Sequence, residues 1–135
     1  MTSITPTKLK AAYAKTGLLP VTRTFTETHI YADGSTRQFA CALTALIAAQ
    51  GWPVERRADP LARTGRDVSN DDTDAACELG KLLGLPQEYA LAFATGWDGF
   101  PNGEVVKSCG AAGQRGWRAG VRCREALKRM GVRVY

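Results

Sequence analysis

The sequence has few of the residues that metal sites and histidine-dependent catalysis require. Its 135 residues include one histidine, His29, and four widely separated cysteines: Cys41, Cys77, Cys109 and Cys123. No two of these residues have the close spacing of a zinc-binding motif, so we expect neither a metal nor another cofactor. The apolar or small neighbours of the cysteines indicate reduced thiols that behave as small apolar side chains.

A membrane-spanning run and an export signal are missing too. The apolar stretch at residues 39–50 would form a helix about 18 Å long, which is too short to cross a bilayer. The N-terminal residues do not show the basic and then apolar order of a secretory signal peptide. We therefore expect a cytoplasmic protein with no membrane partner.

Length and composition favour one globular domain, which we assign to residues 1–135. Apolar residues make up 44% of the chain, enough for a core, and no internal repeat or low-complexity tract divides it. The order of helix and strand patterns predicts an α+β fold that is mostly helical. We expect about five helices around a central apolar helix, together with a small antiparallel sheet.

The expected central helix covers residues 39–50, FACALTALIAAQ, and ten of its twelve residues are apolar. A helix that is apolar on nearly every side belongs in an interior. Gly51 follows at the place where a helix commonly ends in a left-handed residue. The rest of the chain should therefore pack around this helix.

Four further helices are predicted from periodicity and capping residues. Thr5-Pro6 opens the first and Gly17 ends it, and the last covers residues 114–130. Between them, one helix follows the N-cap candidates at 69–73 and another begins at Pro86, and the short turn between these two predicts a helical hairpin. The inward side chains of the first helix of the hairpin should be Ala76, Leu79, Leu82 and Leu83. On the second helix, Tyr89, Phe93 and Trp97 should form one aromatic stripe.

The strand signals are weaker than the helix signals. Residues 21–32 are rich in Thr, Val, Ile, Phe and Tyr, but neither face is cleanly apolar, so an edge strand, an extended loop and a central strand all remain open. Asp33-Gly34 is a turn pair, after which the chain should enter the central helix directly. Short strands are expected at residues 105–106 and 132–135, and residues 54–70 read as a surface loop.

A thiol enzyme would have to pair Cys41 with His29, because there is no other histidine. Cys41 lies inside an apolar run with no adjacent polar group to orient it. We therefore interpret Cys41 as a buried, inert thiol and expect that the protein is not an enzyme.

The positive charge is concentrated in the last quarter of the chain. Residues 1–100 carry ten Lys/Arg and eleven Asp/Glu, whereas residues 101–135 carry eight and two. At about 100° per residue, four arginines of the last helix form one narrow strip, which Glu125 interrupts. These arginines are Arg115, Arg118, Arg122 and Arg129. The strip predicts either a solvated helix face or a contact surface for an acidic protein or a nucleic acid.

We therefore expect a small, non-enzymatic, intracellular binding or regulatory protein of bacterial or phage origin. Its basic last helix would contact an acidic protein partner, with Trp117 as an anchor beside the strip. The alternatives are nucleic-acid binding by the same face, and a small-ligand site in the glycine-rich loop GWDGFPNG, built by Trp97, Asp98 and Phe100.

Three segments together carry a resemblance to other proteins: CALTAL at residues 41–46, FATGWDG at 93–99 and GWRAG at 116–120. They resemble small bacterial proteins with a cysteine-led apolar helix, an aromatic-Asp-Gly turn and a glycine-containing final helix. The resemblance implies no particular activity, so it assigns no functional residue here.

Overall fold

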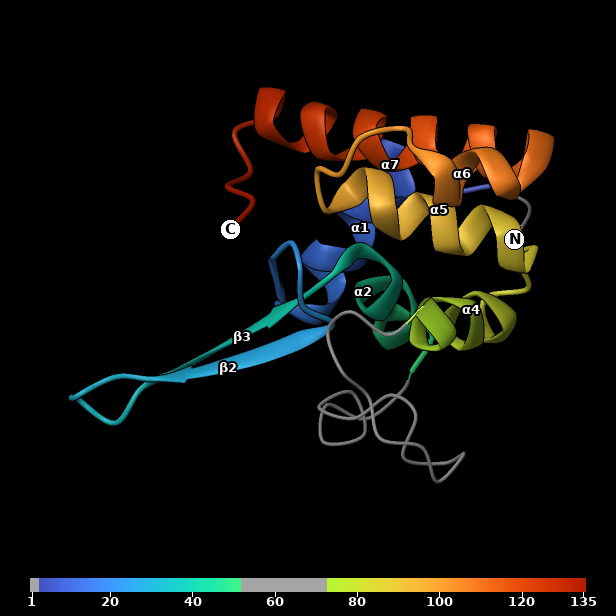
Figure 1. Ribbon diagram of the computed structural model, residues 1–135. Helices are drawn as coiled ribbons and strands as arrows, with labels where there is room; N and C mark the ends of the chain where they lie inside the picture. The colour runs from blue at the N-terminus through green and yellow to red at the C-terminus, as the bar shows by residue number, and fades with distance from the viewer. Residues whose placement is uncertain (1–2, 52–72) are drawn as a thin grey trace.

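The computed structural model describes residues 3–51 and 73–135, which fold mostly into helices with one small sheet (Figure 1). This confirms the α+β, mostly helical fold class. The described elements are α1 (Pro6–Thr16), β1 (Leu19–Pro20), β2 (Thr26–Ile30), β3 (Thr36–Ala40), α2 (Ala42–Ala49), α4 (Thr73–Leu82), α5 (Gln87–Trp97), α6 (Glu104–Ser108) and α7 (Gly110–Arg129). The predicted loop at 54–70 and most of the capping cluster at 69–73 lie outside the described residues.

The central apolar helix is α2, and every residue from Ala42 to Ala48 is buried. It begins three residues later than predicted, because Phe39 and Ala40 are the last residues of β3 and Cys41 is the N-cap. An apolar run has the same composition in a buried strand as in a buried helix, so composition alone could not place this boundary. The hydroxyl of Tyr13 on α1 donates to the carbonyl of Ala40 at 2.8 Å and fixes the strand end against α1.

The sheet has the strand order β1-β3-β2. β2 pairs with β3 in antiparallel register, with Thr26 opposite Ala40 and Ile30 opposite Thr36, so the predicted Asp33-Gly34 turn closes a real hairpin. β1 pairs with β3 in parallel, so the sheet is mixed, whereas a purely antiparallel sheet was expected. Residues 26–30 form an edge strand, one of the three possibilities that their mixed faces allowed.

The aromatic stripe of α5 is confirmed, since Tyr89, Phe93 and Trp97 are all buried. Leu82, expected inside, is 42% exposed and lies in the last turn of α4. α5 packs closely on α7, because a Cβ at Gly116 would overlap the carbonyl of Tyr89. A Cβ at Gly120 would likewise meet the backbone of α5, so both glycines permit the close approach that their spacing predicted.

Two predicted strands are absent from the described chain, in which residues 105–106 are helical and residues 132–135 have no regular structure. Val105 and Val106 lie in α6, where Val106 is fully buried and Glu104 occupies the favourable first turn. The final segment still reaches the sheet, since the Tyr135 amide donates to the carbonyl of Pro20 at 2.9 Å. None of the helices in the described ranges is long and apolar enough to span a membrane.

Candidate functional site

The basic strip lies on α7, which forms an outer layer of the molecule with α5 beneath it (Figure 1). α7 begins at Gly110, four residues earlier than predicted. One side of the helix consists of small and apolar residues that pack inward: Gly113, Gly116, Ala119, Gly120, Cys123, Ala126 and Leu127. Because these residues occupy a single arc, the arginines spaced between them must project from the rest of the helix surface.

We define the basic face of α7 as Arg115, Arg118, Arg122 and Arg129, all of which are exposed. None of the four makes an ion pair or a hydrogen bond through its guanidinium to any residue in the described ranges. From the first to the last, they cover about 21 Å of helix at 1.5 Å per residue. The face therefore presents four positive charges to solvent along one line.

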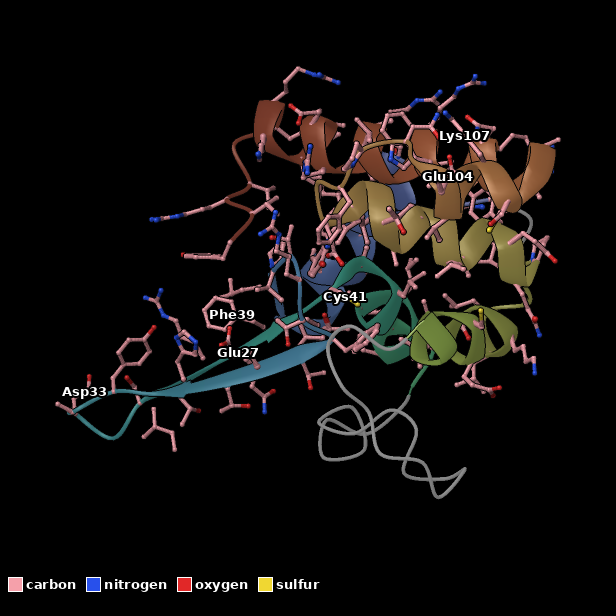
Figure 2. The ribbon with its side chains drawn as sticks, viewed as in Figure 1. Glu27, Asp33, Phe39, Cys41, Glu104 and Lys107 are labelled. Carbon is pink, nitrogen blue, oxygen red and sulfur yellow. The ribbon has the colours of Figure 1, made fainter. Side chains whose placement is uncertain are left out.

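Most of the neighbouring charges add to this positive surface, although Glu104 on α6 is an exposed acid beside Lys107. Lys128 and Arg133 are exposed, and so is Lys107 on the adjacent α6 (Figure 2). Glu125, which interrupts the strip in sequence, lies 3.4 Å from Nη2 of the adjacent Arg124. The nearest acid on α7 is thus engaged by an arginine outside the basic face.

Arg124 itself is a structural residue. Its side chain is only 21% exposed, and its guanidinium lies over Gly99, where a Cβ would meet Nη1. Its Nε is buried and has no hydrogen-bond partner in the structure. Arg124 therefore belongs to the contact between α7 and the loop after α5.

Trp117 is half-buried, and its indole Nε1 donates to the carbonyl of Phe100 at 3.0 Å. Its backbone faces Gly96, where a Cβ would overlap the Trp117 carbonyl. Trp117 thus braces the loop at residues 98–103 against α7. Its use as an anchor for a partner stays a prediction.

The glycine-rich loop is tied to the rest of the protein through several contacts. Trp97 is 1% exposed, and its indole Nε1 donates to the carbonyl of Val21 at 2.9 Å. Oδ1 of Asp98 accepts from the amide of Arg23 at 2.7 Å. Phe100 is 46% exposed, and the guanidinium of Arg23 lies 5.0 Å from its ring centroid.

A small cavity lies beneath this loop, lined by Trp97 and Asp98 together with Thr24, Phe25 and Cys41. Its volume is about 10 Å³, close to the space that a single water molecule needs. Phe100 does not line this cavity, Trp97 is a core residue, and the cavity has no room for a metabolite. A ligand at this loop remains a prediction that no contact in the structure supports.

Cys41 is buried, and burial raises the pKa of its thiol to about 11. Its sulfur lies 3.4 Å from the Thr44 hydroxyl. His29 faces other residues: its Nε2 lies 3.3 Å from a carboxylate oxygen of Glu27, and its ring contacts the Phe39 ring in a tilted arrangement. Figure 2 shows Cys41 inside the helical body and Glu27 out on the hairpin.

Sequence reasoning missed a set of aromatic and cationic side chains on the β2–β3 hairpin. These include Tyr31, His29 and Phe39 together with Arg37. The sequence showed that Glu27, His29 and Tyr31 share one face of a strand. Because β3 was not predicted, the side chains of β3 could not be placed opposite these residues. The ring of Phe39 also contacts the ring of Tyr135, so Tyr135 belongs to the same surface.

In comparisons with known proteins, no family model, curated protein or solved structure matches the chain. The resemblance to small bacterial proteins therefore stays a prediction.

Proposed function

We propose that this chain is a non-enzymatic binding protein that contacts an acidic macromolecule through the basic face of α7. The observation that supports this proposal is the set of four exposed guanidinium groups without internal ion pairs in the described structure. Arginine stays protonated at every physiological pH, so four like charges on one helix face repel one another. An anionic partner relieves that repulsion and forms charge-assisted hydrogen bonds with the same groups.

The first form of the proposal is an acidic protein partner, whose carboxylates would pair with the guanidinium forks. Free cysteines are compatible with a reducing compartment, and the proposal places this contact in the cytoplasm. Trp117, half-buried at the side of the helix, would supply the apolar contact that protein interfaces usually contain.

A second form of the proposal is nucleic-acid binding by the same face. It is favoured by the kind of side chains that lie between the arginines. In the described part of the chain, no large apolar side chain from residue 114 to residue 129 is exposed, and the nearest is Met130. The core of a protein interface is apolar, whereas a phosphate backbone needs only regularly placed positive charge. A face with four arginines and one acid, Glu125, along about 21 Å of helix matches the second requirement better.

The test replaces Arg118 and Arg122 with alanine and compares this variant with Lys8→Ala/Lys10→Ala. The control removes the same charge from exposed positions on α1. Two probes represent the two partner classes: a labelled oligonucleotide and labelled polyglutamate, each measured by fluorescence anisotropy at increasing salt. We expect the α7 variant alone to lose affinity, by roughly tenfold or more for the probe that mimics the partner. Equal affinity of both variants would overturn the proposal.

A further inference from the structure

The β2–β3 hairpin extends beyond the helices as a two-stranded arm (Figure 1). Its turn is closed by two backbone hydrogen bonds at 2.9 Å, from Tyr31 N to Ser35 O and from Gly34 N to Tyr31 O. All of β2 after Thr26 is exposed, although an edge strand needs only one solvated face. In β3 the buried residues are Phe39 and Ala40, at the base of the arm, so the outer part of the arm has more solvated surface than the fold itself requires.

One face of this arm combines aromatic rings with cations. Side chains alternate along a strand, so Glu27, His29 and Tyr31 share the face on which Arg37 and Phe39 lie opposite. The guanidinium of Arg37 lies 5.5 Å from the Tyr31 ring centroid, and the rings of His29 and Phe39 are 4.7 Å apart.

The segment after α7 completes this face. The ring of Tyr135 meets Phe39 edge-on at 5.0 Å, and the guanidinium of Arg133 lies 4.7 Å from the Tyr135 centroid. The backbone of Tyr135 is held at both ends, because its amide donates to Pro20 O and its carbonyl accepts from the Thr22 hydroxyl. We call the complete set the hairpin aromatic face: His29, Tyr31, Arg37, Phe39, Arg133 and Tyr135.

We propose that the hairpin aromatic face binds single-stranded nucleic acid by stacking unpaired bases on Tyr31 and Tyr135. This inference rests on the nucleic-acid form of the proposed function and names the kind of strand. Tyr31 is 41% exposed and Tyr135 is 43% exposed, and each has an arginine over its ring. Neither Arg37 nor Arg133 forms an ion pair within the described chain, so both guanidinium groups are available to phosphates.

Stacking distinguishes single strands from duplexes, because paired bases are already stacked on their neighbours and cannot reach a protein ring. The acids of the arm are engaged locally, which limits their repulsion of phosphate. Glu27 lies beside His29, and Oδ1 of Asp33 accepts from both the amide and the hydroxyl of Ser35 at 2.9 and 2.6 Å. Figure 1 shows the chain after α7 running from the end of that helix toward the sheet, so one segment connects the basic face with Tyr135.

The opposite face of the same strand supplies a matched control. Ile30 is 78% exposed, adjoins Tyr31 and points to the other side of the arm. We would measure anisotropy of a labelled oligothymidylate of about 12 nucleotides, a length within the range that small binding domains cover. The duplex of the same length serves as the second probe, and circular dichroism verifies that each variant folds.

We expect Tyr31→Ala to weaken single-strand binding by roughly tenfold, and Tyr31→Phe to keep it because the ring remains. Arg37→Ala should weaken binding as well, whereas Ile30→Ala should leave it unchanged. No single-strand binding by the wild type, or equal effects of Tyr31→Ala and Ile30→Ala, would overturn the inference. Sedimentation provides a further check: a dimer that both substitutions dissociate would make the arm a self-association surface and also overturn it.

The experiments distinguish failure of the proposed function from failure of this inference. If Arg118→Ala/Arg122→Ala abolishes binding of both probes and the hairpin substitutions change nothing, the proposed function stands and this inference is wrong. If the hairpin substitutions abolish single-strand binding and the α7 substitutions change the affinity for neither probe, the inference stands and the basic face is not the contact surface.

Discussion

The carboxylate of Asp98 holds the backbone of Arg23 in a left-handed conformation. Among the described residues, Arg23 is the only non-glycine residue with a positive φ, which is 66°. Its amide donates to Oδ1 of Asp98 at 2.7 Å. Nε of Arg23 returns a hydrogen bond of 3.4 Å to the Asp98 carbonyl. A non-glycine residue in this region is strained by about 1–2 kcal/mol, so the contact stabilises an unfavourable turn that leads into the sheet.

Asp98→Ala should therefore destabilise the protein. We expect a loss of about 1–2 kcal/mol in the free energy of unfolding, since the amide loses a charged acceptor. Asp98→Asn keeps an oxygen in the same place and should lose less. Urea denaturation of the three proteins measures the difference. Equal stability of the alanine variant and the wild type would show that Asp98 does not hold this turn.

The contact between α5 and α7 predicts a strong effect of adding one methyl group. Gly116→Ala places a Cβ against the backbone of Tyr89, which cannot move without shifting α5, so we expect a loss of roughly 3 kcal/mol. Gly103→Ala is the control, because Gly103 has φ of −101° and the nearest heavy atom to a new Cβ is 3.9 Å away. It should change stability by less than about 1 kcal/mol. Similar melting curves for the two variants would contradict the close packing.

Buried thiols predict a loss of stability at high pH. Burial raises the pKa of Cys41 from 9.0 to about 11, and that of Cys123 to about 12. Below pH 9 both thiols are protonated in the folded and the unfolded chain, so they contribute no pH dependence. Above pH 9 the unfolded chain ionises first, so Cys41 alone should lower stability by about 1.4 kcal/mol per pH unit up to pH 11.

Urea unfolding of the wild type and Cys41→Ala at pH 8 and pH 10 measures this dependence. The difference in stability between the two proteins should shrink at pH 10, because alanine has no proton to lose. A constant difference would mean that Cys41 is not shielded from solvent as the structure describes.

The sequence predicted the features that depend on local pattern. The apolar character of α2 marked the central helix, the spacing of Tyr89, Phe93 and Trp97 placed them on one side of α5, and Gly116 and Gly120 marked a close helix contact. Each of these is a periodicity or a cap within one element.

The features that were missed depend on contacts between distant residues. β3 could not be recognised because Thr36, Arg37 and Gln38 are polar and become a strand only by pairing with β2. The interior position of Trp97 depends on Val21, which is 76 residues away. The hairpin aromatic face needs three separate segments, so no single window of sequence shows it. By contrast, the basic face lies within one helix and followed from its period.

The most direct test of the account is the salt dependence of binding by the basic face. A labelled oligonucleotide is titrated with wild type, Arg118→Ala/Arg122→Ala and Lys8→Ala/Lys10→Ala at several salt concentrations, with labelled polyglutamate as the second probe. If the basic face contacts phosphates, the slope of log K against log [salt] becomes less negative by about 1.8 in the α7 variant, at about 0.9 for each lost contact. For an acidic protein partner, the same variant loses affinity for polyglutamate instead. The account is contradicted if the α7 variant and the α1 control give the same affinities and the same slopes with both probes.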